Sequence, residues 1–188
     1  MIIMNQAKLN RKLNVSRVLG TTIKEGKLVQ KEIAKRMHVT PSAIAHLKKG
    51  DMPLQFENVE ALMKATGKQN QFLAMQVANQ MVGITTPVID GDKIMKEPLA
   101  MAVKTMPELS QAMASIQESM DEMTIPSDQR RNENFKDPEK LVNECFDAVL
   151  YLMNLIAYVC KSFEFSMQDM LKARVKRWIM KGIVKGAD

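Results

Sequence analysis

Apolar residues recur every three or four positions along almost the whole chain of 188 residues, the spacing that gathers them on one face of an α-helix. Glycine and proline interrupt this pattern, and no alternating segments joined by a tight turn predict a β-hairpin. Aromatic residues make up only 5% of the chain, whereas there are 17 methionines, whose flexible side chains fill gaps between helices. The sequence therefore predicts an all-α fold.

Glycine and proline also set the bounds of the expected helices. In the first part of the chain these cover residues 16–26, 30–37, 41–49, 55–65 and 69–82. In the second part they cover 107–123, beginning at a proline, then 138–160 and 166–183. We therefore predict a five-helix domain over 1–83, a linker over 84–98 that contains two prolines, and a helical domain over 99–188.

Charge is distributed unevenly along the chain, whose net charge is +6. Residues 1–68 contain 13 basic and 5 acidic side chains, whereas residues 69–138 contain 6 basic and 10 acidic ones. A basic segment followed by an acidic one is typical of a phosphate-binding module attached to a second module. A basic surface that is merely solvated would give the same pattern.

The cysteines and the longest apolar stretch indicate the compartment. Cys145 and Cys160 fall in one expected helix and cannot form a disulfide framework, which favours a reducing environment. The apolar stretch between them contains Asp147 and Asn154 and is shorter than the roughly 20 residues that a bilayer requires. We expect a cytoplasmic protein with no membrane partner.

Residues 30–50 read QKEIAKRMHVTPSAIAHLKKG and predict two short helices separated by a tight turn. Thr40 is a suitable N-cap for the second helix, Pro41 follows where a missing N–H costs nothing, and Gly50 ends the helix. Apolar residues of both helices are expected to face one another across the turn: Ile33, Ala34, Met37, Val39, Ile44 and Leu47.

Burial of Ile44 and Leu47 determines what the second helix presents to solvent. The opposite face carries Ser42, His46 and Lys49, flanked by Ala43 and Ala45. This face is small, polar and basic, we expect no carboxylate on it, and it suits a helix that enters the major groove of DNA. Serine and histidine can exchange hydrogen bonds with bases, and lysine can reach a phosphate or a guanine.

This stretch resembles the helix-turn-helix of phage repressors and Xre-type regulators, whose domain is lambda-repressor-like, and the resemblance continues to residue 67. The matching residues are Gln30, Ala34, Ile44, Leu47 and Gly50. His38 departs from the family, which usually has glycine in the turn, and Pro41 departs because the family often has a polar reading residue there. A helical hairpin with a solvated basic face is the alternative interpretation.

The resemblance implies double-stranded DNA as the partner, with Gln30 on a phosphate and the outward face of the second helix in the groove. The predicted DNA-binding residues are Gln30, Lys31, Thr40, Ser42, Ala43, His46, Lys48 and Lys49.

The last helices carry apolar stripes that need a partner. The stripe of 139–160 is too wide for one neighbour, and three helices form too thin a layer to bury themselves. We therefore predict self-association through the C-terminal helices. A dimer would place two recognition helices roughly 34 Å apart, on successive turns of the major groove.

The same region also resembles, more weakly, the last two helices of the MazG-like all-α nucleotide pyrophosphohydrolases. In that family acidic pairs on two helices hold Mg²⁺ against a nucleotide triphosphate. Glu144 and Asp147 have the spacing of one pair, since positions i and i+3 share a helix face. The other pair would come from Glu118, Asp121 and Glu122, and the phosphates would lie near Lys176, Arg177 and Lys181.

Other chemistry finds no support in the residue pattern. His38 and His46 lack cysteine or carboxylate partners at zinc-ligand spacing, Cys145 lacks a histidine base, and there is no Gly-rich phosphate loop. We predict no catalytic residue, no metal and no cofactor.

Together these observations predict a sequence-specific DNA-binding transcriptional regulator of phage or prophage type, not an enzyme, that occupies its operator as a dimer or higher oligomer. The alternatives are a MazG-like Mg²⁺-dependent nucleotide pyrophosphohydrolase and an antirepressor-type protein-interaction module.

Overall fold

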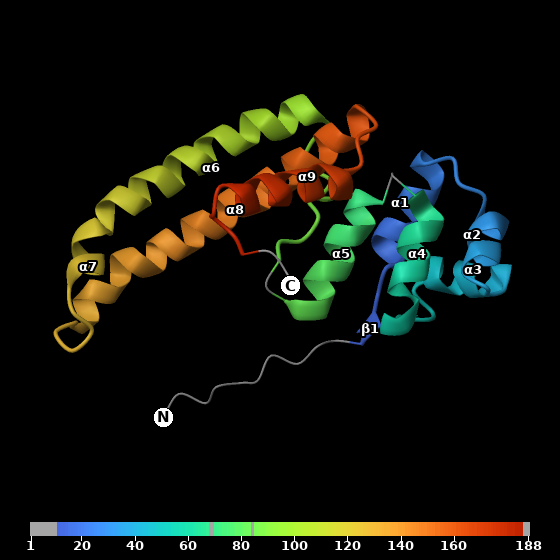
Figure 1. Ribbon diagram of the computed structural model, residues 1–188, viewed down its shortest axis with the longest axis horizontal. Coiled ribbons are helices and arrows are strands. Elements are labelled where there is room, and N and C mark those ends of the chain that lie inside the picture. The colour runs from blue at the N-terminus through green and yellow to red at the C-terminus, as the bar shows by residue number, and fades with distance from the viewer. Residues whose placement is uncertain (1–10, 68–69, 84, 186–188) are drawn as a thin grey trace. The chain divides into compact units, whose positions relative to one another are not determined.

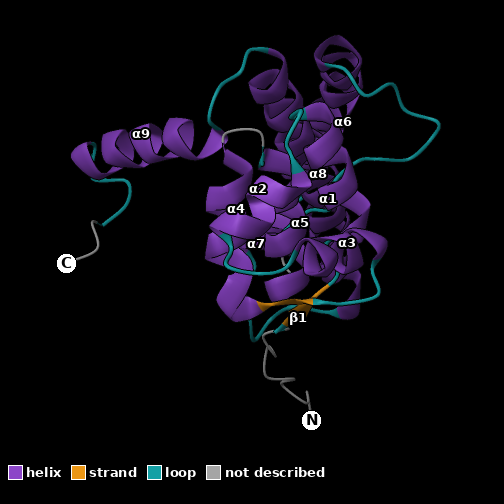
Figure 2. Ribbon diagram, turned by 90° about the vertical axis from the view of Figure 1, so that its right-hand side faces the viewer, coloured by secondary structure: helices purple, strands orange, loops and turns teal. Residues whose placement is uncertain are grey.

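The computed structural model describes residues 11–67, 70–83 and 85–185, which are mostly helical (Figure 1). The predicted all-α class is confirmed at this level. A small antiparallel sheet, drawn in orange in Figure 2, pairs β1 (Lys12–Leu13) with β2 (Leu54–Gln55). Strands of two residues are too short to produce an alternating pattern, so the sequence did not predict them.

The chain divides into two compact units, residues 1–87 together with 163–188, and residues 88–162. The predicted domains differ from this grouping, because they placed the last helix with the second module. That helix, α9 (Met167–Met180), begins after Ser166, whose hydroxyl accepts a hydrogen bond from the backbone N–H of Asp169. No residue of α9 is buried.

Before residue 88, the described part of the first unit forms five α-helices and a short 3-10 helix between Gln55 and Val59. These are α1 (Ser16–Glu25), α2 (Gln30–Arg36), α3 (Pro41–Lys49), η1 (Phe56–Asn58), α4 (Val59–Thr66) and α5 (Gln71–Val82). They enclose an aliphatic core whose fully buried members include Leu13, Leu19, Ile33, Ile44, Leu54, Leu62 and Leu73. The sheet holds the segment before α1 against the segment after α3, and Gln80 on α5 exchanges two hydrogen bonds of 2.7 Å with the backbone of Asn14.

The second unit is built on two long helices that lie side by side in Figures 1 and 2. Its elements are α6 (Pro98–Glu118), α7 (Met120–Thr124), η3 (Asn132–Phe135) and α8 (Lys136–Ser162). Most residues buried in this hairpin are small: Thr105, Ala112, Ser115, Ser119, Ala148 and Ala157. Small side chains allow the two helices to approach closely.

The predicted start of the first long helix is wrong. α6 begins at Pro98, and Pro107 lies inside it. Pro98 occupies the first helical position, where proline is favoured, and the turns that follow bury Met101 and Thr105. Pro107 removes one backbone hydrogen bond from α6, and the burial of Met101 and Thr105 stabilises the helix despite this loss. α8 likewise begins before Pro138, which lies in its first turn.

The predicted linker also contains structure, because Val88 and Ile89 are buried. The side-chain oxygen of Asn154, which is fully buried on α8, accepts a hydrogen bond of 2.8 Å from the Ile89 N–H, and its amide donates to the Leu150 carbonyl. The Tyr158 hydroxyl donates to the Ile89 carbonyl at 3.2 Å. Two polar side chains of α8 therefore bond to the backbone N–H and carbonyl of the buried Ile89.

Residues 132–162 are long and apolar enough to cross a membrane by length and composition alone. One such helix is weak evidence of a membrane span. In the second unit, α8 pairs with α6 and uses Asn154 and Tyr158 to bind the chain at Ile89. The cytoplasmic location stays a prediction.

We expect Asn154→Leu to lower the free energy of unfolding by about 1–3 kcal/mol, because the buried Ile89 N–H loses its acceptor. Asn143→Leu, on the exposed side of the same helix, should change it by less than about 0.5 kcal/mol. Urea unfolding followed by circular dichroism measures both, and equal effects would show that the Asn154 hydrogen bonds do not stabilise the hairpin.

Candidate nucleic-acid interface

Helix α3 forms where the sequence predicts it, and local interactions set both ends. The Thr40 hydroxyl accepts a hydrogen bond of 3.2 Å from the Ala43 N–H, and Pro41 is the first helical residue. Gly50 ends the helix in the left-handed conformation at φ +87°. A Cβ at Gly50 would also lie 3.1 Å from the Ser16 hydroxyl oxygen. The left-handed backbone and the lack of space for a Cβ both favour glycine at this position.

The turn between α2 and α3 contains His38 at φ +55°. The backbone N–H of Met37 bonds to the Ile33 carbonyl and that of Val39 to the Ala34 carbonyl, which closes the end of α2. The left-handed geometry that glycine adopts without strain is therefore held here by a histidine, at an energetic cost.

Apolar packing orients α3 against α2. Ile33 and Ala34 on α2 and Ile44 and Leu47 on α3 are all at most 3% exposed. Met37 is buried as well, and Val39 is half-buried. Gln30 adds a polar contact, because its side-chain amide donates a hydrogen bond of 2.8 Å to the Pro41 carbonyl. The angle between the helices is thus determined at the core and at the turn.

The opposite face of α3 is open to solvent. Ser42, His46 and Lys49 are exposed, whereas Ala43 and Ala45 are half-buried. Of the other predicted contact residues, Lys31, Thr40 and Lys48 are exposed and Gln30 is half-buried. Lys48 lies toward α1, since a Cβ at Gly20 would be 3.5 Å from its Cγ. All eight residues therefore lie on or beside the α2–α3 pair.

The expectation that no carboxylate lies on this face is wrong. Asp51 Oδ2 is 3.3 Å from His46 Nδ1, and both side chains are more than half exposed. The glycine turn produces this contact, because the Asp51 N–H bonds back to the His46 carbonyl at 3.1 Å and folds the chain over the end of α3. The glycine predicted to end α3 at residue 50 was the sequence signal for this turn, since a helix often ends on a left-handed glycine.

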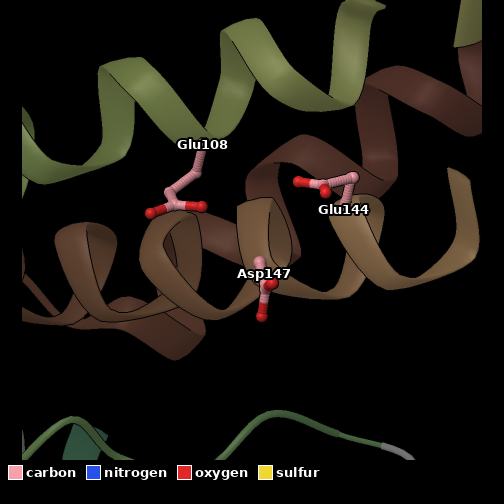
Figure 3. Close-up of side chains that lie close together, drawn as sticks. All are labelled: Glu108, Glu144 and Asp147. Carbon is pink, nitrogen blue, oxygen red and sulfur yellow. The ribbon is translucent and has the colours of Figure 1, made fainter. Parts of the chain in front are cut away.

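A second candidate site lies in the other unit, where three carboxylates converge. Figure 3 shows Glu108 on α6 and Glu144 and Asp147 on α8. One oxygen from each lies within 4.8 Å of the others, and no second such group of acidic, histidine or cysteine residues occurs among the described residues. Carboxylate oxygens are the ligands that Mg²⁺ prefers.

The predicted partners of Glu144 and Asp147 are not in this cluster. Glu118 instead forms an ion pair of 2.7 Å with Lys140, and it raises the pKa of that lysine. Asp121 and Glu122 lie on α7 and do not belong to the cluster either. The sequence did not indicate Glu108, because no acidic neighbour at i+3 or i+4 marks it and the other glutamate of α6, Glu118, is ten residues away.

No protein-family model, curated protein or solved structure matches this chain. The assignment of either site therefore depends on its residues and geometry.

Replacing His38 by glycine should raise the free energy of unfolding by about 0.5–1 kcal/mol. Removing the side chain relieves the left-handed strain, which costs about 1–2 kcal/mol. The greater freedom of glycine in the unfolded chain opposes this gain by about 0.4–1 kcal/mol. His38→Ala keeps the Cβ and should give no such gain. Thermal unfolding of the two variants tests this, and equal stabilities would mean that φ at residue 38 carries no strain.

Proposed function

We propose that this protein is a sequence-specific DNA-binding regulator, in which α3 enters the major groove and two copies occupy one operator. Binding there would block or recruit RNA polymerase. The observation that carries the proposal is the exposed face of α3, where Ser42, His46 and Lys49 point away from a helix that is anchored through Ile44 and Leu47.

The dimensions and chemistry of α3 support this role. An α-helix with its side chains is about 10–12 Å in diameter and fits the roughly 12 Å width of the major groove, and the nine residues of α3 would extend about 13 Å along it. Half-buried alanines beside the polar residues leave room for close approach to base edges. The fixed angle between α2 and α3 would let phosphate contacts near Lys31 and Lys48 set the register of the recognition face.

Asp51 gives His46 a definite role in the proposal. A carboxylate beside the groove repels phosphate, so it weakens binding to any DNA, but it can also orient the imidazole through the 3.3 Å contact. The imidazole would then present Nε2 to a base. Specificity would thus come from the orientation of a few side chains, while the lysines supply affinity.

Selection from a random pool of duplex DNA by the purified full chain is the decisive experiment. A recovered motif, near-palindromic if two copies bind, supports the proposal. Uniform recovery of all sequences, or no retention at physiological salt, contradicts it and favours a protein-interaction module that uses the α2–α3 pair as a scaffold.

Variants separate phosphate contacts from base contacts. Lys49→Ala should weaken binding to operator and random DNA, and should make the salt slope shallower by about one if Lys49 contacts a phosphate. His46→Ala and Ser42→Ala should instead change the selected motif, with a loss of about 1–3 kcal/mol confined to the operator. Fluorescence anisotropy across salt concentrations measures each.

Lys64→Ala is the matched control, because Lys64 lies on α4 and pairs with Glu60 there. It should leave both slope and motif unchanged. Equal losses on operator and random DNA for His46→Ala and Ser42→Ala would contradict the roles assigned to them.

The convergence of Glu108, Glu144 and Asp147 favours a second candidate function, Mg²⁺-dependent release of pyrophosphate from a nucleotide. It predicts that Asp147→Asn abolishes release from a panel of nucleoside triphosphates, whereas Asp121→Asn, outside the cluster, does not. Pyrophosphate detection with and without Mg²⁺ measures this. Wild-type protein without Mg²⁺-dependent release would eliminate the candidate.

A further inference from the structure

The hairpin of α6 and α8 buries small side chains and exposes large ones. Its outer surface contains a groove with a volume of about 430 Å³, lined by residues from α6, α7 and α8. The lining residues are Ile116, Met123, Leu141, Val142, Cys145, Phe146 and Val149. Small-molecule sites combine apolar walls with a few polar groups, whereas this lining has no charged or amide side chain.

Apolar residues continue the groove along α6 and α7 on one side and along α8 on the other, with similar spacing. On one side Met113, Ile116, Met120 and Met123 follow one another at intervals of three, four and three residues. On the other side Val142, Phe146, Val149, Met153 and Ile156 alternate intervals of four and three. This is the spacing of seams that pack against further helices in coiled coils and four-helix bundles.

The exposed area matches what a specific dimer buries. Among these residues the eight that are substantially exposed range from 40% for Ile116 to 64% for Met113. At roughly 100 Å² for each half-exposed large side chain they present roughly 800 Å², close to the ~800 Å² that each partner of a standard interface contributes. A typical monomer carries an apolar patch of only about 300–600 Å².

We infer that this groove binds the same groove of a second copy, so that two α6–α8 hairpins form a four-helix bundle around a two-fold axis. A two-fold interface requires a surface that is complementary to itself. The apolar residues on the two sides of the groove have the same heptad spacing. The flexible side chains of Met113, Met120 and Met123 can interdigitate with Phe146 of the second copy. Phe146, 56% exposed and on the groove wall, is the central anchor of this interface.

The inference deepens the proposed function, which needs two copies on one operator, but its test uses no DNA. A chain that dimerises through the groove and selects no DNA motif would refute the proposed function alone. A monomer that selects a motif would refute the inference and leave sequence-specific DNA binding by α3 standing.

Analytical ultracentrifugation of the full chain tests the interface. Wild-type protein should sediment as a dimer at micromolar concentrations, and Phe146→Glu and Met123→Glu should each weaken dimerisation at least tenfold, because they place a charge in an apolar contact. Met180→Glu makes the same change at a 78% exposed methionine of α9 and should leave the dimer intact. A wild-type monomer up to about 100 µM, or dissociation by Met180→Glu alone, would overturn the inference.

Cys145 provides a readout in the unaltered protein, because its half-buried thiol lines the groove. Its rate of maleimide labelling, followed by mass spectrometry, should fall at least tenfold as the protein concentration rises through the dimerisation range. Cys160 is the internal reference, since it is buried and burial raises the pKa of its thiol, so it should react slowly throughout. A Cys145 rate independent of concentration would show that a second copy does not cover the groove, even if the glutamate variants fail to fold.

Discussion

The burial of Ile44 and Leu47 is the constraint on which the proposed recognition surface depends. Both side chains lie in the core of the first unit, so α3 has no freedom to rotate about its axis. Rotation by one residue, about 100°, would expose an apolar side chain and bury a polar one. The side of α3 that carries Ser42 and His46 is therefore solvent-exposed as a consequence of packing on the opposite side. The cap at Thr40 and the contact from Gln30 to Pro41 then fix where the helix begins and how it meets α2.

Features determined by neighbouring residues could be predicted from the sequence. The bounds of α3, the cap at Thr40 and the terminating glycine at residue 50 depend on local chemistry, and the structure has all three. The predicted helix start at Pro107 was wrong, because proline usually begins or ends a helix. The burial that keeps α6 helical on both sides of Pro107 is a tertiary effect, which the local sequence does not show. The contact of Asp51 with His46 and the approach of Glu108 to Glu144 depend on the path of the folded backbone. Helical periodicity in the sequence does not predict them.

The two units use opposite patterns of burial, and this difference accounts for their expected roles. Within residues 11–87, the first unit places large aliphatic residues such as Leu19, Leu62 and Leu73 inside and exposes mostly polar and charged residues. It has the core that a small domain needs. The α6–α8 hairpin places alanine, serine and threonine between its helices and leaves methionine, valine and phenylalanine on the surface. Close approach of two helices over small residues gives a rigid layer, and the hydrophobic area that would stabilise it further lies on the outside.

Three exposed methionines of α6 and α7 connect the surface of the second unit to redox chemistry. Met113, Met120 and Met123 are each at least half exposed. Oxidation of a thioether to the sulfoxide adds a polar oxygen to a side chain whose contribution here is apolar contact, and reductases reverse the change. The apolar character of this surface thus depends on the oxidation state of sulfur as well as on the sequence, and an oxidising environment would change it without altering the buried alanines between α6 and α8.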